Sequence, residues 1–217
     1  NYIAKRLSFT SNIKQALNLS DIIFICVGTP TKKGSTKVDL SYVLKCTKEI
    51  FKYTKRKKII VTKSTVPIGT GDEIEKILKK KKKLFTVISN PEFLREGEAI
   101  RDFRFPDRIV IGSNVKNSFS IMRKLYAPLI NKGSKFFTTS RRGAELIKYA
   151  SNAFLATKIT FINELANLCE KSGVNIEDIS LGMGSDSRIG GRFLRAGPAY
   201  GGSCFPKDTK GLVSAAD

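Results

Sequence analysis

The sequence predicts an α/β protein in which a doubly wound parallel sheet is followed by a helical region. Through the first two thirds of the 217 residues, short apolar runs alternate with longer segments that carry apolar residues at helical spacing. From Arg142 onwards the strand-like runs stop and one long helical pattern takes over. Strands that alternate with helices favour a parallel sheet with helices on both faces. We therefore expect two domains, residues 1–140 and residues 141–217.

Each expected strand is a short apolar run, and each expected helix has an apolar side. The first strand is expected at 21–27, buried and ended by the turn Gly28-Thr29-Pro30. The other strands are expected at 58–62, 85–89, 108–111 and 135–138. Helices are expected at 39–52, 71–80 and 117–130 in the first domain, and at 143–171 and 176–181 in the second. A glycine-rich loop then leads to Cys204.

The composition excludes several classes of protein. The chain has no histidine, so proton transfer must fall to carboxylates, lysine, cysteine, tyrosine or water. No apolar run approaches the roughly 20 residues of a membrane span, and the first residues do not resemble a secretory signal. The four cysteines are widely spaced without a CxxC pair. This spacing argues against a metal site and a disulfide framework, and it favours a cytoplasmic location.

The net charge of +20 raises the question of nucleic-acid binding. The lysines are spread along the chain except for the run 79–83, and no aromatic residues interleave with that run. The run closes the expected helix 71–80, where the helix dipole favours cations. We therefore expect a solvated basic surface, compatible with anionic ligands such as nucleotides, and no nucleic-acid partner.

The segment from Gly201 to Asp208 has the features of a reactive cysteine site. Cys204 follows a glycine pair, which lets a ligand approach the backbone closely. Pro206 suits the first turn of a helix, so we expect Cys204 at or just before a helix N-terminus. The helix dipole and Lys207 would there favour the nucleophilic thiolate. An inert buried cysteine is the alternative, which the flanking residues argue against.

Three polar loops, 28–31, 63–67 and 90–97, each follow a predicted strand. In open α/β sheets, ligands bind outside the carboxyl ends of the strands, so the three loops predict one cleft. On the long helix, Lys148 and Asn152 are four residues apart and share a face. That face is either solvated or part of the cleft.

Taken together, these segments resemble the nucleotide-sugar 6-dehydrogenase family. The matching motifs occur in the family's order, at 27–31, 63–67, 90–97, 107–112, 144–152 and 188–208. The resemblance implies a Rossmann-like NAD-binding domain and oxidation of a C6 hydroxyl to a carboxylate, with reduction of two NAD. The carbon would pass through a thiohemiacetal and a thioester at Cys204. UDP-glucose is the expected substrate, with GDP-mannose or another UDP-sugar as alternatives. A non-catalytic basic module for dimerisation or nucleic-acid binding is an alternative of another class.

The resemblance also implies roles for single residues. Lys148 would stabilise the oxyanion and Asn152 would hold substrate or water. Asp208 and Glu92 would assist the water and proton steps, with Thr65 ordering that water. The nucleotide sugar would contact Glu92, Phe93, Leu94, Arg95, Glu96, Lys148, Asn152, Arg188, Arg195, Gly197, Tyr200 and Gly201. The cofactor would contact Thr29, Thr31, Ser64, Thr65, Glu96 and Lys207. Arg188 matches a position that reaches the neighbouring subunit's substrate, which implies a homodimer.

The sequence departs from the family in one respect. The GxGxxG turn that cradles the cofactor pyrophosphate is absent. Gly69-Thr70-Gly71 and Gly182-Met183-Gly184 lack the third glycine, so neither replaces it. We expect an interior piece of a longer enzyme, without its first NAD-binding unit and its C-terminal nucleotide-binding domain, and inactive alone.

Overall fold

The computed structural model of the chain describes residues 6–198, 200 and 202–216. It divides into two compact units. Unit 1 comprises residues 1–32 and 38–148, and unit 2 comprises residues 33–37 and 149–217.

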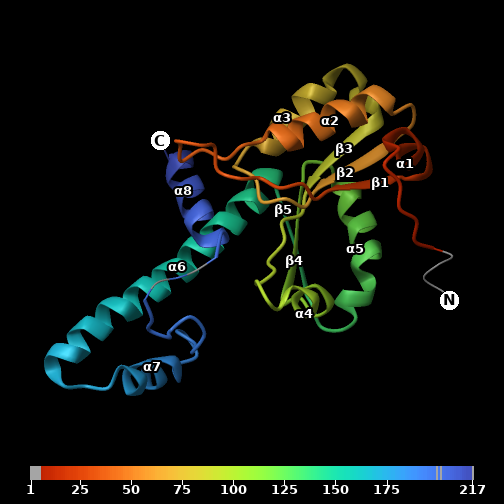
Figure 1. The fold of residues 1–217 in the computed structure, drawn as a ribbon. Coiled ribbons are helices and arrows are strands. Elements are labelled where there is room, and N and C mark those ends of the chain that lie inside the picture. Colours follow the sequence, from red (N-terminus) through yellow and green to blue (C-terminus); the bar gives the residue numbers. More distant parts are fainter. Residues whose placement is uncertain (1–5, 199, 201, 217) are drawn as a thin grey trace. The chain divides into compact units, whose positions relative to one another are not determined.

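Unit 1 contains a sheet of five strands in the spatial order β1-β2-β3-β4-β5 (Figure 1). The strands are β1 (Ile22–Ile25), β2 (Lys58–Thr62), β3 (Phe85–Ser89), β4 (Arg108–Ser113) and β5 (Lys135–Thr139). The pairs β1–β2, β2–β3 and β4–β5 are parallel. The α/β class and all five predicted strands are confirmed.

One pairing departs from the expected parallel sheet. β4 runs antiparallel to β3 through the register Ile88↔Ser113 and Ser89↔Gly112. The only helix in the connection is the six-residue α4 (Ala99–Arg104), which the sequence analysis did not predict. At 1.5 Å per residue α4 spans about 9 Å, less than the roughly 16 Å of a five-residue strand. The chain is therefore not carried back across the sheet as in a parallel crossover.

Helices cover both faces of the sheet because successive strand residues point in opposite directions. The helices are α1 (Ile13–Leu19), α2 (Ser41–Tyr53), α3 (Thr70–Leu78) and α5 (Lys116–Ile130). Ile60 and Val87 pack into one apolar cluster with α1, α2 and α3. Their neighbours Val61 and Ile88 pack into a second cluster with α5. Figure 1 shows these two layers of unit 1. This is the predicted doubly wound arrangement, with α1 as an unpredicted helix.

Two local predictions for unit 1 were wrong. β1 is an edge strand of the described sheet rather than a buried one, so Phe24 is 37% exposed.

The lysine run does not extend α3 but forms a 3-10 segment, η1 (Lys79–Leu84). Lys81 Nζ donates to the carbonyl oxygens of Phe51 (2.8 Å) and Thr54 (3.2 Å). It therefore stabilises the C-terminus of α2, where unpaired carbonyls attract a cation.

The long predicted helix is α6 (Arg141–Ser172), whose first eight residues belong to unit 1 and the rest to unit 2. Gly173 ends it in a left-handed conformation (φ +69°), with the N–H of Val174 bonded to the carbonyl of Cys169. α7 (Ile176–Gly184) runs three residues beyond the expected end, and Gly182-Met183-Gly184 lies inside it.

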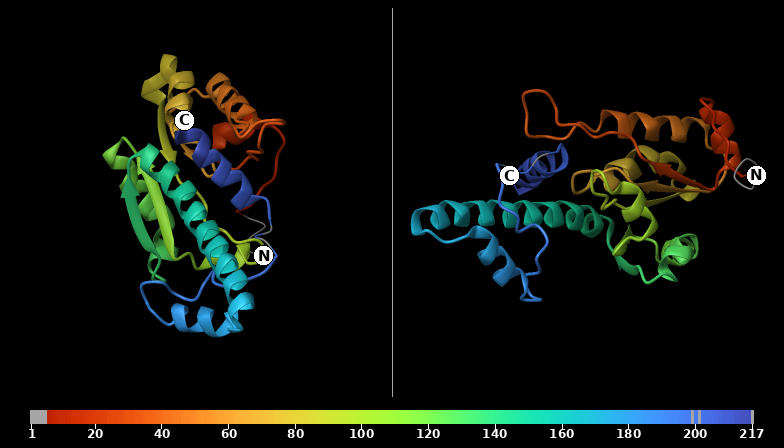
Figure 2. Two further views of the ribbon diagram at one scale, coloured as in Figure 1. Left: turned by 90° about the vertical axis from the view of Figure 1, so that its left-hand side faces the viewer. Right: turned by 60° about the horizontal axis from the view of Figure 1, so that its bottom comes forward.

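The last helix of unit 2, α8 (Cys204–Ala216), lies alongside α6 in both views of Figure 2. A Cβ atom on Gly211 would lie 2.7 Å from Cε1 of Tyr149, so only glycine permits this close approach. None of the described helices is long and apolar enough to cross a membrane.

Candidate active site

In unit 1 the loops that follow β1 and β2 are bonded to one another. Thr29 Oγ1 donates to the carbonyl of Thr65 at 2.7 Å, and Ser64 Oγ donates to the carbonyl of Val27 at 2.6 Å. Thr29 and Thr65 are both buried. Thr31 forms a β-bridge with Val38. Thr29, Ser64 and Thr65, three of the predicted cofactor contacts, thus lie close together at the carboxyl ends of two parallel strands.

The third loop, residues 90–97, is anchored at its first residue. The buried Asn90 donates through Nδ2 to the carbonyl of Val110 (2.9 Å) and accepts the hydroxyl of Tyr126 at Oδ1 (2.5 Å). Burial, and then Cys26, raise the pKa of Tyr126 to about 12, so its hydroxyl stays a donor at neutral pH. This anchor fixes the loop two residues before Glu92.

Lys148 lies against this loop and is not a solvated surface lysine. Its side chain is only 4% exposed, and its Nζ lies 3.2 Å from Glu92 Oε1. The ammonium also lies 5.4 Å from the centre of the Phe93 ring, within the range of a cation–π contact. The buried ammonium needs a partner for its charge, so the half-buried Glu92 holds Lys148 in position.

A second ammonium group, Lys63, belongs to the same region of unit 1. Burial lowers the pKa of Lys63 to about 8; Glu92 and Cys26 oppose this shift, and Lys148 adds to it. Its Nζ lies 6.0 Å from the ring centre of Tyr126. From the sequence Lys63 is expected in a cleft loop but has no predicted role, because its burial depends on packing that the motif does not reveal.

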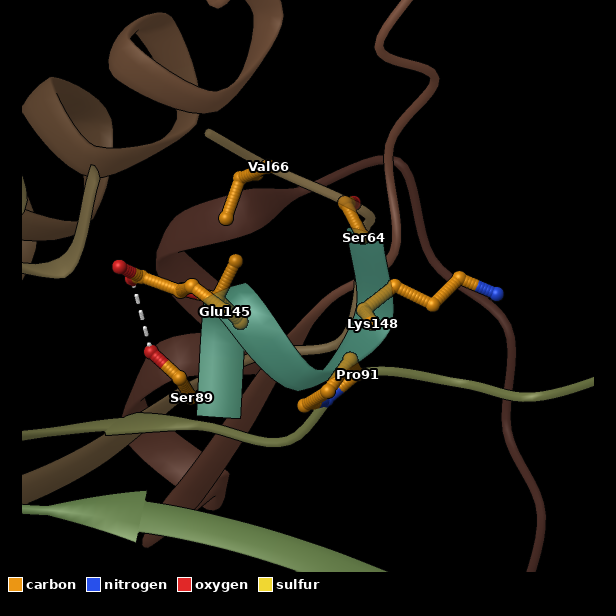
Figure 3. A pocket seen from close by; sticks show the side chains of 7 residues that line it. Ser64, Val66, Ser89, Pro91, Glu145 and Lys148 are labelled. Carbon is orange, nitrogen blue, oxygen red and sulfur yellow. Dashed lines mark hydrogen bonds between the residues drawn. The ribbon is translucent and has the colours of Figure 1, made fainter. Parts of the chain in front are cut away.

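A small pocket next to these groups is lined by Thr62, Ser64, Val66, Ser89, Pro91, Glu145 and Lys148. Figure 3 shows the Lys148 side chain contributing its stem while the ammonium points away, and Glu145 turned toward Ser89. Burial raises the pKa of Glu145, and hydrogen bonds from Gly69, Gly71 and Ser89 oppose this shift. Glu145 is not among the site residues predicted from the sequence, although it lies in the motif 144–152.

In unit 2, α8 begins at Cys204, as predicted, and the thiol is exposed. One turn later Asp208 is 1% exposed. Its carboxylate accepts from Asn152 Nδ2 at 2.6 Å and from Lys207 Nζ at 2.6 Å. Asn152, Asp208 and Lys207 are therefore brought together, with the charge of Lys207 directed at Asp208. All four cysteines are free.

The predicted substrate contacts of the loop before α8 have varied surroundings. Gly197 N–H donates to Asn163 Oδ1 at 2.9 Å. The Tyr200 ring meets the Phe205 ring edge-on at 5.8 Å. Arg195 is exposed, and Arg188 is exposed and paired with Asp186 at 2.6 Å. Gly201 lies outside the described residues.

Three of the predicted contacts in unit 1 face solvent. Leu94 and Glu96 are exposed. Arg95 is exposed too, but its guanidinium makes two bonds to Asp102, at 2.9 and 2.6 Å. That pair commits Arg95 to its own segment, and the side chain would have to leave Asp102 to bind a substrate.

The residues of this chain fit part of an NAD molecule. The loops after β1 and β2 follow parallel strands, and a Cβ atom on Gly28 would meet nothing within 4 Å. By contrast, the first amides of α3, Gly69 and Gly71, are already bonded to Glu145. Gly69-Thr70-Gly71 therefore does not offer a helix N-terminus to a pyrophosphate. Among the residues described, no group of three or more His, Cys, Asp or Glu could hold a metal.

The fold and these loops define a dinucleotide-binding α/β protein of the dehydrogenase type. The sequence model of the NAD binding domain of the UDP-glucose/GDP-mannose dehydrogenase family matches residues 1–130, and that of the family's central domain matches residues 142–217. The chain belongs to the UDP-glucose/GDP-mannose dehydrogenase family.

Individual relatives agree with this assignment. UDP-glucose 6-dehydrogenase of Rhizobium meliloti is 53% identical over 220 residues, which cover 100% of the chain and 50% of that protein. The enzyme of the same name from Rickettsia felis is 54% identical over 209 residues, 96% of the chain and 46% of that protein. The chain thus spans about half the length of the curated relatives it matches.

Solved structures with the same fold include other members of the family. A UDP-glucose dehydrogenase from Pyrobaculum islandicum matches with a TM-score of 0.90 and 38% identity, over 98% of this chain and 50% of that chain. A GDP-mannose dehydrogenase from Pseudomonas aeruginosa matches with a TM-score of 0.79 and 34% identity, over the same shares.

Proposed function

We propose that the chain carries the NAD-facing and cysteine-bearing parts of a UDP-glucose 6-dehydrogenase. Residues 1–140 would form part of its NAD-binding domain and residues 141–217 its central helical domain. The observation that carries the proposal is the exposed Cys204 at the start of α8, one turn before the buried Asp208 that Asn152 holds. The matches to the family's NAD binding and central domains support the proposal, because a double oxidation of one carbon calls for a group that holds the aldehyde between the two steps.

The proposed reaction oxidises one carbon twice. The C6 alcohol first loses a proton and a hydride to give an aldehyde. The Cys204 thiolate adds to the aldehyde carbon, which forms a C–S bond and an alkoxide that takes up a proton as a thiohemiacetal. Loss of a proton and a second hydride then gives a thioester. Water attacks the thioester, the C–S bond breaks, and the products are the carboxylate, the regenerated thiolate and protons.

We assign the supporting roles to residues whose surroundings suit them. Lys148, buried and paired with Glu92, stabilises negative charge that develops on the substrate oxygen. Asp208 assists the attack of water on the thioester. Asn152 orients the Asp208 carboxylate through their hydrogen bond and helps to hold the substrate or the water. Thr65, whose carbonyl is held by Thr29, orders the attacking water together with Glu92.

NAD, when bound, accepts the hydride in each oxidation. Thr29, Thr31, Ser64 and Thr65 would hold it beside the sheet, and Glu96 and Lys207 complete the proposed contacts. The nucleotide sugar would contact residues 92–96, Lys148, Asn152, Arg188, Arg195, Gly197, Tyr200 and Gly201. The four free cysteines suit a reducing compartment, and we place the enzyme in the cytoplasm.

The test is turnover by the complete enzyme that contains this chain, with NAD and a panel of nucleotide sugars. UDP-glucose should give two NADH for each UDP-glucuronate formed. A higher kcat/KM for GDP-mannose or another UDP-sugar would change the substrate within the family. No turnover of any nucleotide sugar, with a steep salt dependence of DNA binding, would favour a basic nucleic-acid-binding module instead.

We further propose a homodimer formed through α6. Phe154, Phe161 and Leu168 follow one another at seven-residue spacing along this helix and are 66%, 51% and 59% exposed. A stripe of this kind is the usual contact surface between paired helices. Light scattering should give twice the chain mass for the wild type and the chain mass for Phe161→Glu. Leu181→Glu, at an apolar position on α7 that is 74% exposed, is the control that should stay dimeric.

A further inference from the structure

Glu145 is a buried carboxylate on α6 to which the proposed chemistry gives no role. It is 2% exposed, and its two oxygens accept three hydrogen bonds. Oε2 accepts the N–H of Gly69 at 2.7 Å, and Oε1 accepts the N–H of Gly71 at 2.9 Å and the hydroxyl of Ser89 at 3.0 Å. Gly69 is the N-cap of α3 and Gly71 lies in its first turn, so the carboxylate closes the N-terminus of another helix.

The three segments that meet at this carboxylate are the ones that carry the proposed site of unit 1. Gly69 ends the loop that contains Ser64 and Thr65. Ser89 ends β3, three residues before Glu92. Glu145 itself lies one helical turn before Lys148, which forms an ion pair with Glu92. A single side chain therefore connects the loop after β2, the loop after β3 and the helix that bears the buried lysine.

No similar residue can make the same three contacts. Glutamine has one acceptor oxygen, and its amide group would turn an N–H toward one of the N–H donors. Aspartate is one methylene shorter and could not reach both α3 and β3. A charged group is also costly to bury unless its hydrogen bonds are made, so the three contacts define one position for the carboxylate.

We infer that Glu145 is a positioning residue that fixes the register of Lys148 against the Thr65 and Glu92 loops. It does not touch substrate or cofactor in this assignment but acts through its three hydrogen bonds. The inference rests on the proposed function, because its catalytic consequence requires Lys148 to act on the substrate. Misplacement of a catalytic group by about 1 Å can cost two orders of magnitude in rate, so the expected signature is a loss of kcat.

The experiment compares Glu145→Gln, Ser89→Ala and Glu75→Gln with the wild type in the complete enzyme. Glu75 is the control because it pairs with Arg141 across the same two helices and lies within α3 rather than in either loop. We expect kcat per folded enzyme to fall at least about tenfold in Glu145→Gln and about three- to tenfold in Ser89→Ala, with the KM for UDP-glucose within about threefold. Glu75→Gln should keep the wild-type kcat.

A second measurement tests the geometry without catalysis. In the 217-residue chain, hydrogen exchange at the amides of Gly69 and Gly71 should be slow, and Glu145→Gln should accelerate it at least about tenfold. Equal exchange in both proteins overturns the inference. A kcat within twofold of wild type in Glu145→Gln also overturns it. If Glu145→Gln does not fold, a kcat within twofold of wild type in Ser89→Ala overturns it instead. An inactive wild-type enzyme would instead refute the proposed function, and the exchange result would still decide the geometry.

Discussion

Asn152 and Asp208 lie 56 residues apart and are joined by a hydrogen bond of 2.6 Å between Nδ2 and Oδ2. Asp208 is 1% exposed and would be costly to bury without partners. The bond fixes α8 against α6 within unit 2, with the face of α8 that carries Asp208 turned toward α6. Because Cys204 is the first residue of α8, the same bond determines where the helix start lies in this unit.

Asp208→Asn should lower the free energy of unfolding of the chain. Asn152 and Lys207 donate to different oxygens of Asp208, and an amide keeps only one acceptor oxygen, so one of the two donors loses its partner. A buried donor left unpaired costs about 1–3 kcal/mol, measurable by urea denaturation. Asp186→Asn is the control, since Asp186 pairs only with the exposed Arg188 and a surface ion pair contributes about 0–1 kcal/mol. Equal losses in the two variants would contradict the structural importance of the Asp208 carboxylate.

Cys204→Ala should abolish formation of the sugar acid by the complete enzyme. Without the thiol no thioester forms, and the aldehyde has no covalent anchor. Cys204→Ser could form only an ester that hydrolyses slowly. Chromatographic measurement of UDP-glucuronate checks this, with Cys46→Ala on α2 as the control that should keep activity. Wild-type production of acid by Cys204→Ala would end the covalent mechanism.

Lys148→Ala should lower the kcat of the complete enzyme by about a hundredfold or more. This is the scale of losing a group that stabilises an oxyanion. The variant also leaves Glu92 without the ammonium that lies 3.2 Å away. Steady-state kinetics measure the effect, with Lys124→Ala on the exposed side of α5 as the control. A change confined to KM would make Lys148 a binding residue instead.

The sequence predicted the elements that carry their own periodicity and missed contacts between distant segments. All five strands and the long helix lie within a few residues of their expected ranges, since their apolar patterns are local. The six-residue α4 is too short for such a pattern. The antiparallel pairing of β4 with β3, which this short connection produces, was therefore not predicted either. Lys81 caps α2 rather than α3, because its ammonium bonds to the carbonyls of Phe51 and Thr54, which are 27 to 30 residues away in the sequence.

The same limit applies to the site. Strand-end loops and a glycine-flanked cysteine are readable motifs, so Thr65, Glu92 and Cys204 could be selected from the sequence. Glu145 lies in the motif 144–152, but its partners are 56 to 76 residues away, so the motif does not reveal its hydrogen bonds. Lys63 lies inside a selected motif, but its lowered pKa comes from burial, which only the packed structure shows.

The 217 residues alone should not turn over UDP-glucose with NAD. The chain lacks the GxGxxG turn, and the start of α3 is closed by Glu145, so no helix N-terminus at Gly69 is open to the pyrophosphate. Loss of one anchor for a reactant removes much of the rate gained by positioning, which is worth several kcal/mol. NADH absorbance with purified chain tests this. Sustained NADH production that disappears in Cys204→Ala would show that these residues suffice.

The stability of the chain should increase with pH between about 8 and 10 because of Lys63. Its folded-state pKa is about 8, lowered mainly by burial, whereas the unfolded value is 10.5. Within this window the folded chain holds Lys63 neutral while the unfolded chain binds the proton. The unfolded state then has more bound protons, so the free energy of unfolding rises with pH. Below pH 8 Lys63 is charged in both states, so it no longer makes the free energy of unfolding change with pH.

Lys63→Met isolates this effect from the other groups that titrate in the same window, such as exposed lysines. Urea unfolding at pH 7.5 and at pH 10 should show the wild type gaining on the order of 1–2 kcal/mol relative to Lys63→Met. Tyr126, whose pKa is raised to about 12, contributes with the opposite sign only above pH 10 and is present in both proteins. Lys124→Met, at an exposed position, should follow the wild type. A pH dependence identical in wild type and Lys63→Met would mean that Lys63 stays protonated in the folded chain, with Glu92 outweighing the cost of burial.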